Sequence, residues 1–98
     1  MIVVRNAFRL KFGKAKEAKA LWKDGVGLLK KAGGTNHRLL TDATGPFYTL
    51  VLESTYKNLA DFEAVMTSAM GGPEFEAWYQ KFVPLVDSGS REIFTVVE

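Results

Sequence analysis

The stretch "FYTLVLEST", residues 47–55, is the most strand-like segment of this 98-residue chain, and it decides the fold. It is an almost continuous run of apolar and β-branched residues, which are enriched on pleated surfaces. Alternate side chains of a strand point to opposite faces, so Phe47 and Val51 fall on one side and Leu50 and Leu52 on the other. The stretch therefore predicts a strand with apolar side chains on both faces.

The flanking sequence predicts further elements in an alternating order. Residues 2–10 alternate as a strand, and residues 14–32 then switch to the helical period. We expect strands at 2–10, 36–41, 47–55 and 91–97, helices at 14–32, about 58–70 and 73–83, a turn at 42–46 and a loop at 87–90, "DSGS". The order β-α-β-β-α-β is that of a ferredoxin-like α+β fold, a four-stranded antiparallel sheet with its helices on one face. Residues 1–98 are expected to form this single domain.

Local signals mark the helix ends. Asn58, with Asp61 three residues on, predicts an N-cap. Pro73 suits a first helical position, and Pro84 predicts an end near Val83. The helix from 58 is expected to turn Leu59, Phe62, Met66 and Ala69 inward. Gly25 and Gly27 weaken the first helix by about 1 kcal/mol each and suggest a bend or a close approach to the sheet.

The last helix carries four aromatic residues on one face, at i, i+3, i+4 and i+7. They are Phe75, Trp78, Tyr79 and Phe82. An aromatic stripe at this spacing normally packs into a core, so part of it is expected to be core and part to wall a pocket.

Composition excludes several classes of function. The chain has no cysteine and one histidine, His37, which excludes disulfides, thiol catalysis and a multi-histidine metal site within one chain. Arg5 and Arg9 interrupt the apolar N-terminus, so it does not read as a signal peptide, and no apolar run is long enough to span a membrane. We expect a cytoplasmic protein, since absence of cysteine fits a reducing compartment.

Charge is unevenly distributed although the net charge is only +2. Residues 1–42 hold ten Lys/Arg against three Asp/Glu, and residues 43–98 hold three against eight. A basic face for an anionic partner is one reading, and a solvated lysine-rich helix is the simpler one.

The apolar sheet face left open by the helices has to be covered, because a large exposed apolar patch is a liability. A second copy, single-stranded RNA, or a small ligand held between two copies are the three candidates. RNA-recognition modules stack bases on strand aromatics, but Val3 stands where "IVVRNA" would need one, and "GPFYTLVLE" lacks the basic start of the second signature. We therefore expect no nucleic-acid partner.

Three segments carry a family resemblance. They are "RNAFRLKFGKAKEA" (5–18), "YKNLADFEAV" (56–65), in which Tyr56, Asn58 and Phe62 match an aromatic–x–Ser/Asn–x–x–x–Phe pattern, and "PEFEAWYQKF" (73–82) after a helix break. The chain resembles the dimeric α+β barrel superfamily of antibiotic-biosynthesis monooxygenases, haem-degrading monooxygenases and NIPSNAP-like proteins. The resemblance implies a homodimeric barrel, with a pocket between each sheet and its own second helical region.

The resemblance argues against haem degradation. Haem degraders of this superfamily use an Asn on the first strand, a Trp on the helix and a His that ligates iron. Asn6 matches the first, but the Trp position falls on Val65 and the His position near Tyr79. Only certain haem enzymes use a phenol as ligand, so we expect no cofactor.

Cofactor-independent monooxygenases are the preferred enzymatic interpretation. The resemblance implies a pocket in which Asn, Trp, Tyr and Arg groups surround a polyphenolic substrate, stabilise its enolate or phenolate and let the substrate carbanion react with oxygen. Asn6, Arg9, Tyr56, Trp78 and Tyr79 supply those residue types. No dedicated acid–base pair is visible.

His37 is a separate candidate, as the side chain that titrates nearest neutrality, although it sits on a predicted edge strand. Arg5 and Arg9 share one face of a central strand, where either Glu53 or Glu92 pairs with them or they line a polar barrel interior for an anionic ligand.

The sequence thus predicts a small-molecule-binding homodimeric barrel whose ligand is aromatic or anionic, with no membrane partner and no metal. Pocket candidates are Asn6, Arg9, His37, Tyr56, Trp78 and Tyr79, and catalytic residues are not assigned. The alternative is a non-catalytic binding or assembly module in which the pocket is only core.

Overall fold

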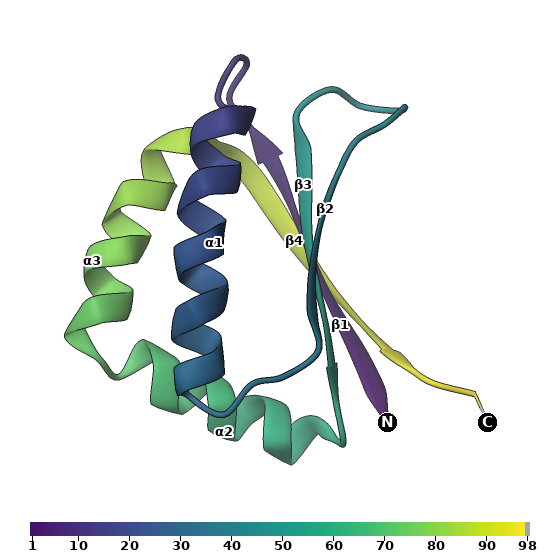
Figure 1. Ribbon diagram of the computed structural model, residues 1–98. Coiled ribbons are helices and arrows are strands. Elements are labelled where there is room, and N and C mark those ends of the chain that lie inside the picture. The colour runs from purple at the N-terminus through teal and green to yellow at the C-terminus, as the bar shows by residue number, and fades with distance from the viewer. Residues whose placement is uncertain (98) are drawn as a thin grey trace.

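The computed structural model describes residues 1–97, and its elements follow the predicted order (Figure 1). The second helical region is split into two helices by Gly71 and Gly72. The elements are β1 (Ile2–Leu10), α1 (Ala15–Lys31), β2 (His37–Thr41), β3 (Thr49–Tyr56), α2 (Leu59–Met70), α3 (Pro73–Phe82), a 3-10 turn (Val83–Leu85) and β4 (Val86–Thr95). The predicted ferredoxin-like βαββαβ fold is confirmed.

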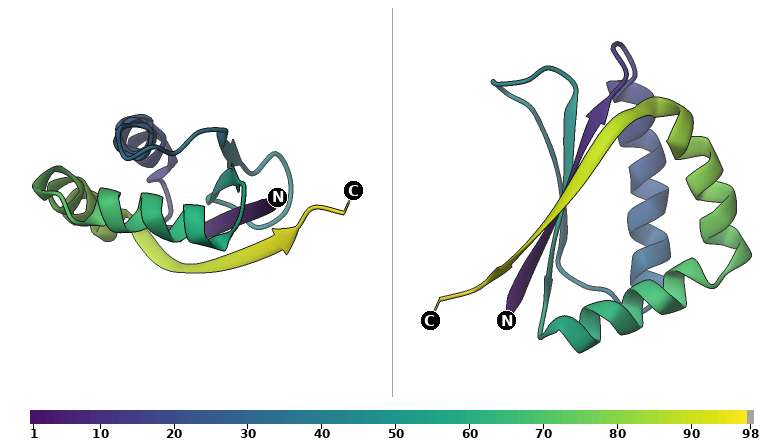
Figure 2. Two further views of the ribbon diagram at one scale, coloured as in Figure 1. Left: turned by 90° about the horizontal axis from the view of Figure 1, so that it is seen from below. Right: turned by 180° about the vertical axis from the view of Figure 1, so that it is seen from behind.

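The four strands form one antiparallel sheet in the order β2-β3-β1-β4. All three helices lie on one side of this sheet, with α2 crossing below α1 and α3 (Figures 1 and 2). No helix of residues 1–97 lies over the other side. The molecule therefore has a helix-covered face and an open face.

Alternation along β3 places its larger apolar groups under the helices. Leu50 and Leu52 are buried there, whereas Val51 on the open face is half-buried. The strand begins at Thr49, so the prediction that it starts at Phe47 is wrong. Tyr48 has a positive φ of 59°, which breaks the extended backbone, and Phe47 is 71% exposed before it.

The predicted loop at residues 87–90 is also wrong, because β4 already begins at Val86. Ser88, Gly89 and Ser90 pair with Arg9, Phe8 and Ala7 of β1. The turn-forming composition of "DSGS" gives way here to the backbone hydrogen bonds that the central strand offers. Gly89 also suits the site, since a Cβ there would lie 3.1 Å from the Phe8 ring.

α1 is continuous, and its two internal glycines differ. Gly25 is buried against α3, where an added Cβ would lie 2.6 Å from the Trp78 ring, whereas Gly27 has open space. The predicted close approach is therefore present at Gly25, but to α3 rather than to the sheet.

α2 begins as predicted, with Asn58 Oδ1 accepting a hydrogen bond of 2.9 Å from the Asp61 N–H. Its buried residues are Phe62, Val65 and Ala69. Leu59, predicted to point inward, is 53% exposed because the buried stripe starts one turn later, at Phe62.

α3 confirms its two proline signals: Pro73 is its first residue, and it ends at Phe82, two residues before Pro84. Trp78 and Phe82 are buried and Phe75 is partly buried, but Tyr79 is 45% exposed. No helix within residues 1–97 combines the length and apolarity needed to cross a bilayer.

Candidate functional site

A cavity of about 820 Å³ lies between the helix-covered face of the sheet and the helices α2 and α3. This size is within the usual range of small-molecule sites. Ten aromatic and thioether side chains line it, and these are Phe8, Trp22, Tyr56, Phe62, Met66, Met70, Phe75, Trp78, Tyr79 and Phe82. The stripe on α3 therefore serves both as core and as cavity wall.

The wall is built on a rigid aromatic cluster. The ring centroids of Trp22 and Trp78 lie 4.5 Å apart, and Phe82 stacks on Trp78 at 5.3 Å. Trp78 Nε1 donates a hydrogen bond of 2.7 Å to the backbone oxygen of Leu21, which fixes the indole between α1 and α3. Trp22, Trp78 and Phe82 therefore pack on one another in the wall of the cavity.

The sheet supplies a row of polar groups to this cavity. Asn6 of β1 and Arg91 of β4 are cross-strand partners, and Arg91 Nε donates to Asn6 Oδ1 at 2.7 Å. The guanidinium also lies 5.3 Å from the centroid of the Phe62 ring, a cation–π distance. Arg91 is exposed, so this cation stands where the cavity opens to solvent.

Ser54 and Tyr56 of β3 continue the row and are both buried. Ser54 Oγ lies 2.7 Å from Nδ1 of His37, its cross-strand partner on β2. Burial lowers the pKa of His37 below its usual value, so the imidazole is neutral at pH 7. Burial likewise raises the pKa of the Tyr56 phenol, which stays protonated.

Four of the predicted pocket candidates meet in the cavity: Asn6, Tyr56, Trp78 and Tyr79. His37 does not line it but touches it through Ser54. Arg9 lies apart, because it is exposed between Phe8 and Leu10, whose side chains face the helices. Val65, the position matched to a tryptophan of haem degraders, is buried in a core cluster with Tyr56 and Phe62.

Two residues of the site were missed from the sequence. Arg91 was placed on the last strand, but its register against Asn6 depends on β4 starting at Val86. Ser54 could have been found, since it continues the alternation of Leu50 and Leu52 toward the helices.

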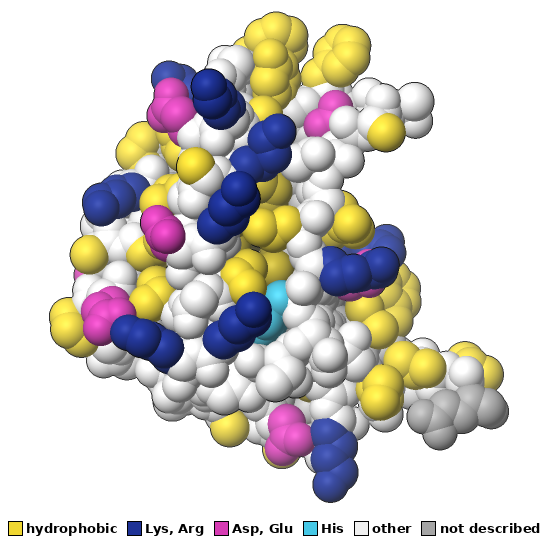
Figure 3. All heavy atoms as spheres, viewed as in Figure 1, with side chains coloured by type: hydrophobic (Ala, Val, Ile, Leu, Met, Phe, Trp, Pro, Cys, Tyr) yellow, Lys and Arg dark blue, Asp and Glu magenta, His cyan; other side chains and the backbone are white. Residues whose placement is uncertain are grey.

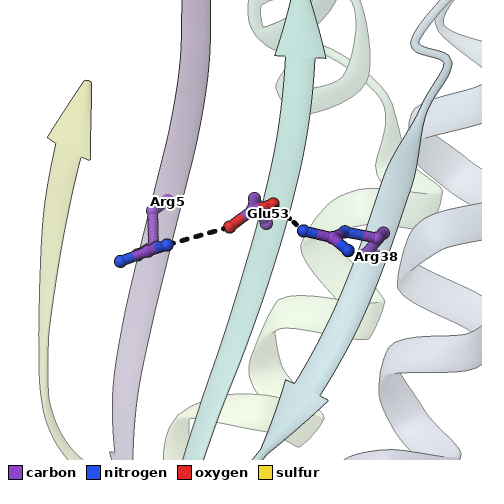
Figure 4. Close-up of polar contacts among 3 residues, drawn as sticks. All are labelled: Arg5, Arg38 and Glu53. Atoms are coloured by element: carbon purple, nitrogen blue, oxygen red, sulfur yellow. Dashed lines mark hydrogen bonds and ion pairs between the residues drawn. The ribbon is translucent and has the colours of Figure 1, made fainter. Parts of the chain in front are cut away.

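The open face holds a different polar group. Glu53 lies between Arg5 and Arg38 on three neighbouring strands and forms an ion pair with each (Figure 4). The Glu53–Arg5 oxygen-to-nitrogen distance is 3.1 Å. The hydrogen bonds from Arg38 and Arg5 hold the pKa of Glu53 below its usual value. Of the two predicted partners of Arg5, the structure thus selects Glu53.

The described part of the chain contains no cluster of three or more His, Cys, Asp or Glu side chains that could hold a metal ion. On its cavity side the sheet offers instead one cation, one amide, one phenol and one hydroxyl, all at an aromatic wall. This arrangement can hold a flat molecule by its faces and an oxygen substituent by hydrogen bonds.

Solved structures with similar folds cover nearly the whole chain. Atu4242 from Agrobacterium tumefaciens, described as a NIPSNAP family protein with unknown function, has a TM-score of 0.91 at 19% identity over 99% of this chain and 94% of its own. An uncharacterized NIPSNAP domain protein from Burkholderia xenovorans has a TM-score of 0.86 at 20% identity, over 99% of this chain and 95% of its own.

An enzyme is also among the similar structures. SnoaB from Streptomyces nogalater, a cofactor-independent oxygenase, has a TM-score of 0.76 at 16% identity, over 99% of this chain and 93% of its own. At such identities the likeness establishes the shared fold. No curated protein sequence matches the chain. The NIPSNAP family model matches residues 5–98, nearly the full length, and the chain therefore belongs to the NIPSNAP family.

Proposed function

We propose that this protein binds a small aromatic or conjugated organic anion in the cavity between the sheet and α2–α3. The observation that carries the proposal is the Arg91–Asn6 pair at the opening of an aromatic-walled cavity. A guanidinium has five N–H donors in a planar fork, which suits an anionic oxygen pair. Aromatic walls add dispersion and offset stacking for a flat ring system.

A second donor supports the same ligand chemistry. Trp22 lines the cavity, and its Nε1 is buried without a hydrogen-bond partner among residues 1–97. A buried donor left unpaired costs free energy that a ligand oxygen would recover. We therefore expect a ligand with oxygen substituents at more than one point of its ring system.

The binding test uses two probes with the same ring system. Naphthalene-2-carboxylate carries the charge, and naphthalene-2-carboxamide does not. Both tryptophans of the chain line the cavity, so quenching of their fluorescence reports occupancy directly. We expect the carboxylate to bind at least about tenfold more tightly than the amide, or about 1.4 kcal/mol.

Arg91→Gln should abolish that preference, and Arg9→Gln is the matched control because Arg9 lies on the open face. Equal affinity for the two probes in the wild type, or an unchanged preference in Arg91→Gln, would contradict the proposal.

Cofactor-independent oxygenation is the enzymatic function that this cavity supports best. The fold it shares with SnoaB raises it above other reactions, and the Arg91–Asn6 pair provides stabilisation for an enolate or phenolate oxygen. The activated methylene of the substrate would lose a proton, react with dioxygen and eliminate water. In sum CH2 and O2 give C=O and H2O, with the substrate itself supplying the electrons.

Oxygen consumption with an anthrone, measured without added metal or flavin, tests this step. Turnover that falls in Arg91→Gln but not in Arg9→Gln would support it. Tight binding of the naphthoate with no oxygen uptake would favour the alternative, a non-catalytic binding module.

We also propose that a second copy of the chain covers the open face, giving a homodimer. Besides the Glu53 ion pairs, that face carries Val3, Val51, Leu40 and Phe94, and the last two are well exposed. Apolar sheet surface of this kind commonly marks an interaction site.

A cytoplasmic location stays part of the proposal, and cell fractionation would test it.

A further inference from the structure

The Ser54–His37 pair is a polar contact of the cavity floor that the proposed function does not use. Ser54 is only 2% exposed, and its hydroxyl is bonded to a neutral imidazole rather than to solvent. Ser54 lines the cavity while His37 stands behind it on the edge strand β2. The serine therefore separates the histidine from any bound molecule by a single hydroxyl group.

The tautomer of His37 sets the direction of its hydrogen bond with Ser54. Nε2 is buried against Gly34, where an added Cβ would lie 2.7 Å away. The Gly34 backbone acts to raise the pKa of His37, as an accepting carbonyl does for a protonated nitrogen, although the contact falls outside normal hydrogen-bond geometry. A proton on Nε2 leaves Nδ1 as an acceptor for the Ser54 hydroxyl.

Few charges face this ring. Lys30 of α1 is the charged group whose field reaches it and acts with burial against the imidazolium, while the Tyr56 ring lies 6.4 Å away and is neutral. Burial first, and the field of Lys30 to a smaller extent, lower the pKa of His37 and favour the neutral imidazole, and an anion nearby would favour its protonation.

We propose that Ser54 and His37 form a proton relay that receives a proton from an acidic hydroxyl or C–H group of the bound ligand. The inference rests on the proposed function and deepens it, because it supplies the base that the Arg91–Asn6 pair lacks. Ser54 Oγ accepts the ligand proton as its own hydroxyl proton passes to Nδ1 of His37. The products are a ligand anion, an unchanged serine and an imidazolium, so charge and protons balance.

The same floor stabilises both products. The ligand anion lies on the same side as Arg91, and the positive charge of Arg91 offsets the charge of the anion. The field of the anion in turn opposes the effect of Lys30 on the imidazolium. Ser54 lies opposite Val4 of β1, and Val4 is two residues before Asn6 on the same strand. The relay and the Arg91–Asn6 pair are therefore neighbours on the sheet. A ligand of one or two rings would reach both.

The first test needs no ligand. His37 is the only histidine of the chain, so its side-chain nitrogen signals in a ¹⁵N-labelled sample need no assignment. At pH 7 we expect the neutral tautomer with the proton on Nε2. The tautomer with the proton on Nδ1 would make the histidine the donor to Ser54 and would overturn the relay.

The second test adds 4-nitrophenol, whose phenolate absorbs visible light. In the wild type at pH 7, where part of the free probe is already ionised, binding should raise the phenolate fraction of the probe and the imidazolium fraction of His37 together. In Ser54→Ala the probe should still bind, by tryptophan quenching, but the His37 signals should stay neutral. Thr67→Ala, which removes a cavity hydroxyl from α2 that does not touch His37, is the matched control and should behave as the wild type.

The two proposals fail in different ways. If nitrophenol does not bind, the proposed ligand class is contradicted, and the tautomer still decides the relay. If it binds and His37 stays neutral in the wild type, or becomes imidazolium in Ser54→Ala as well, the relay is overturned while the binding function stands.

Discussion

Glu53 and Ser54 are neighbours on β3, yet they belong to two very different surfaces. Ser54 faces the helices, where the cavity combines an aromatic wall with polar side chains, of which Glu63, Glu76 and Arg91 are charged. Glu53 faces the open side, where it forms ion pairs with two arginines (Figure 4). Apolar side chains such as the half-buried Val51 share that face. The helix side is covered by helices of the same chain, whereas the open side combines paired charges with apolar surface, as interfaces do.

A third surface contrasts with both. The lysines of α1 form a row on the outer side of that helix, with apolar side chains visible between the helix and the sheet (Figure 3). Two of the lysines that flank or end α1 are paired with carboxylates, Lys14 with Glu17 and Lys31 with Glu74. The charge asymmetry of the sequence therefore reflects mainly a solvated helix face, to which Arg5, Arg9 and Arg38 on the open face of the sheet add.

The largest effect is expected on the helix side, from Trp78→Ala. Trp78 is buried against Trp22 and Phe82 and anchored to Leu21, so its removal loses transfer free energy and leaves a void. We expect the free energy of unfolding to fall by about 3–5 kcal/mol in urea denaturation. Tyr79→Phe, one residue on and exposed, should change it by less than about 0.5 kcal/mol. A small effect at Trp78 would mean that the aromatic wall is not core.

The open face should respond in association rather than in folding. Val51→Lys puts a charge in the middle of that face, beside the half-buried Ala7 of β1. If a second copy covers it, dimerisation should weaken by roughly 100-fold, or about 3 kcal/mol, in sedimentation velocity experiments. Lys16→Glu on the solvated side of α1 is the control. A wild-type monomer at micromolar concentration would refute the dimer.

The sequence predicts which side chains are buried better than it predicts which residues meet across neighbouring strands. Burial follows directly from spacing in two places: the alternation of Leu50 and Leu52 along β3 and the aromatic stripe of α3. These patterns are enough to predict that the helices cover one face of the sheet and to predict most residues of the cavity wall. Cross-strand partners are not encoded locally. Arg91 meets Asn6 only through the register of β4, which the turn-like residues "DSGS" concealed.

Backbone conformation explains the remaining errors. The positive φ of Tyr48 shortens β3 at its start, and tyrosine gives no sign of adopting such a conformation. Arg9 illustrates the limit of residue types alone: it was grouped with Asn6 by chemistry, although the strand alternation already placed the two on opposite faces.

The two internal glycines of α1 test whether α1 and α3 are in contact on the helix side. Gly25→Ala would push a methyl group against the Trp78 ring, and we expect a loss of about 1–3 kcal/mol in thermal or urea unfolding. Gly27→Ala meets open space, so the gain in helix propensity should stabilise the protein by up to about 1 kcal/mol. Opposite signs at positions two residues apart would confirm that α1 and α3 touch at Gly25. Equal effects would contradict it.

The smallest effect is expected from Glu53→Gln, and it should depend on pH. Both arginines are well exposed, so the ion pairs contribute only about 1 kcal/mol at pH 7. Because the folded pKa of Glu53 is lowered, this contribution is present above the unfolded value of 4.5 and is lost as pH falls through the folded pKa. The difference in unfolding free energy between wild type and Glu53→Gln should therefore shrink toward zero in acid. Glu92 of β4 lies opposite Arg5 on the other side of β1, but it forms no ion pair within residues 1–97. Glu92→Gln should therefore change the free energy of unfolding only slightly at every pH. If the difference in unfolding free energy between wild type and Glu53→Gln instead grew in acid, Glu53 would be strained on the open face rather than stabilised there.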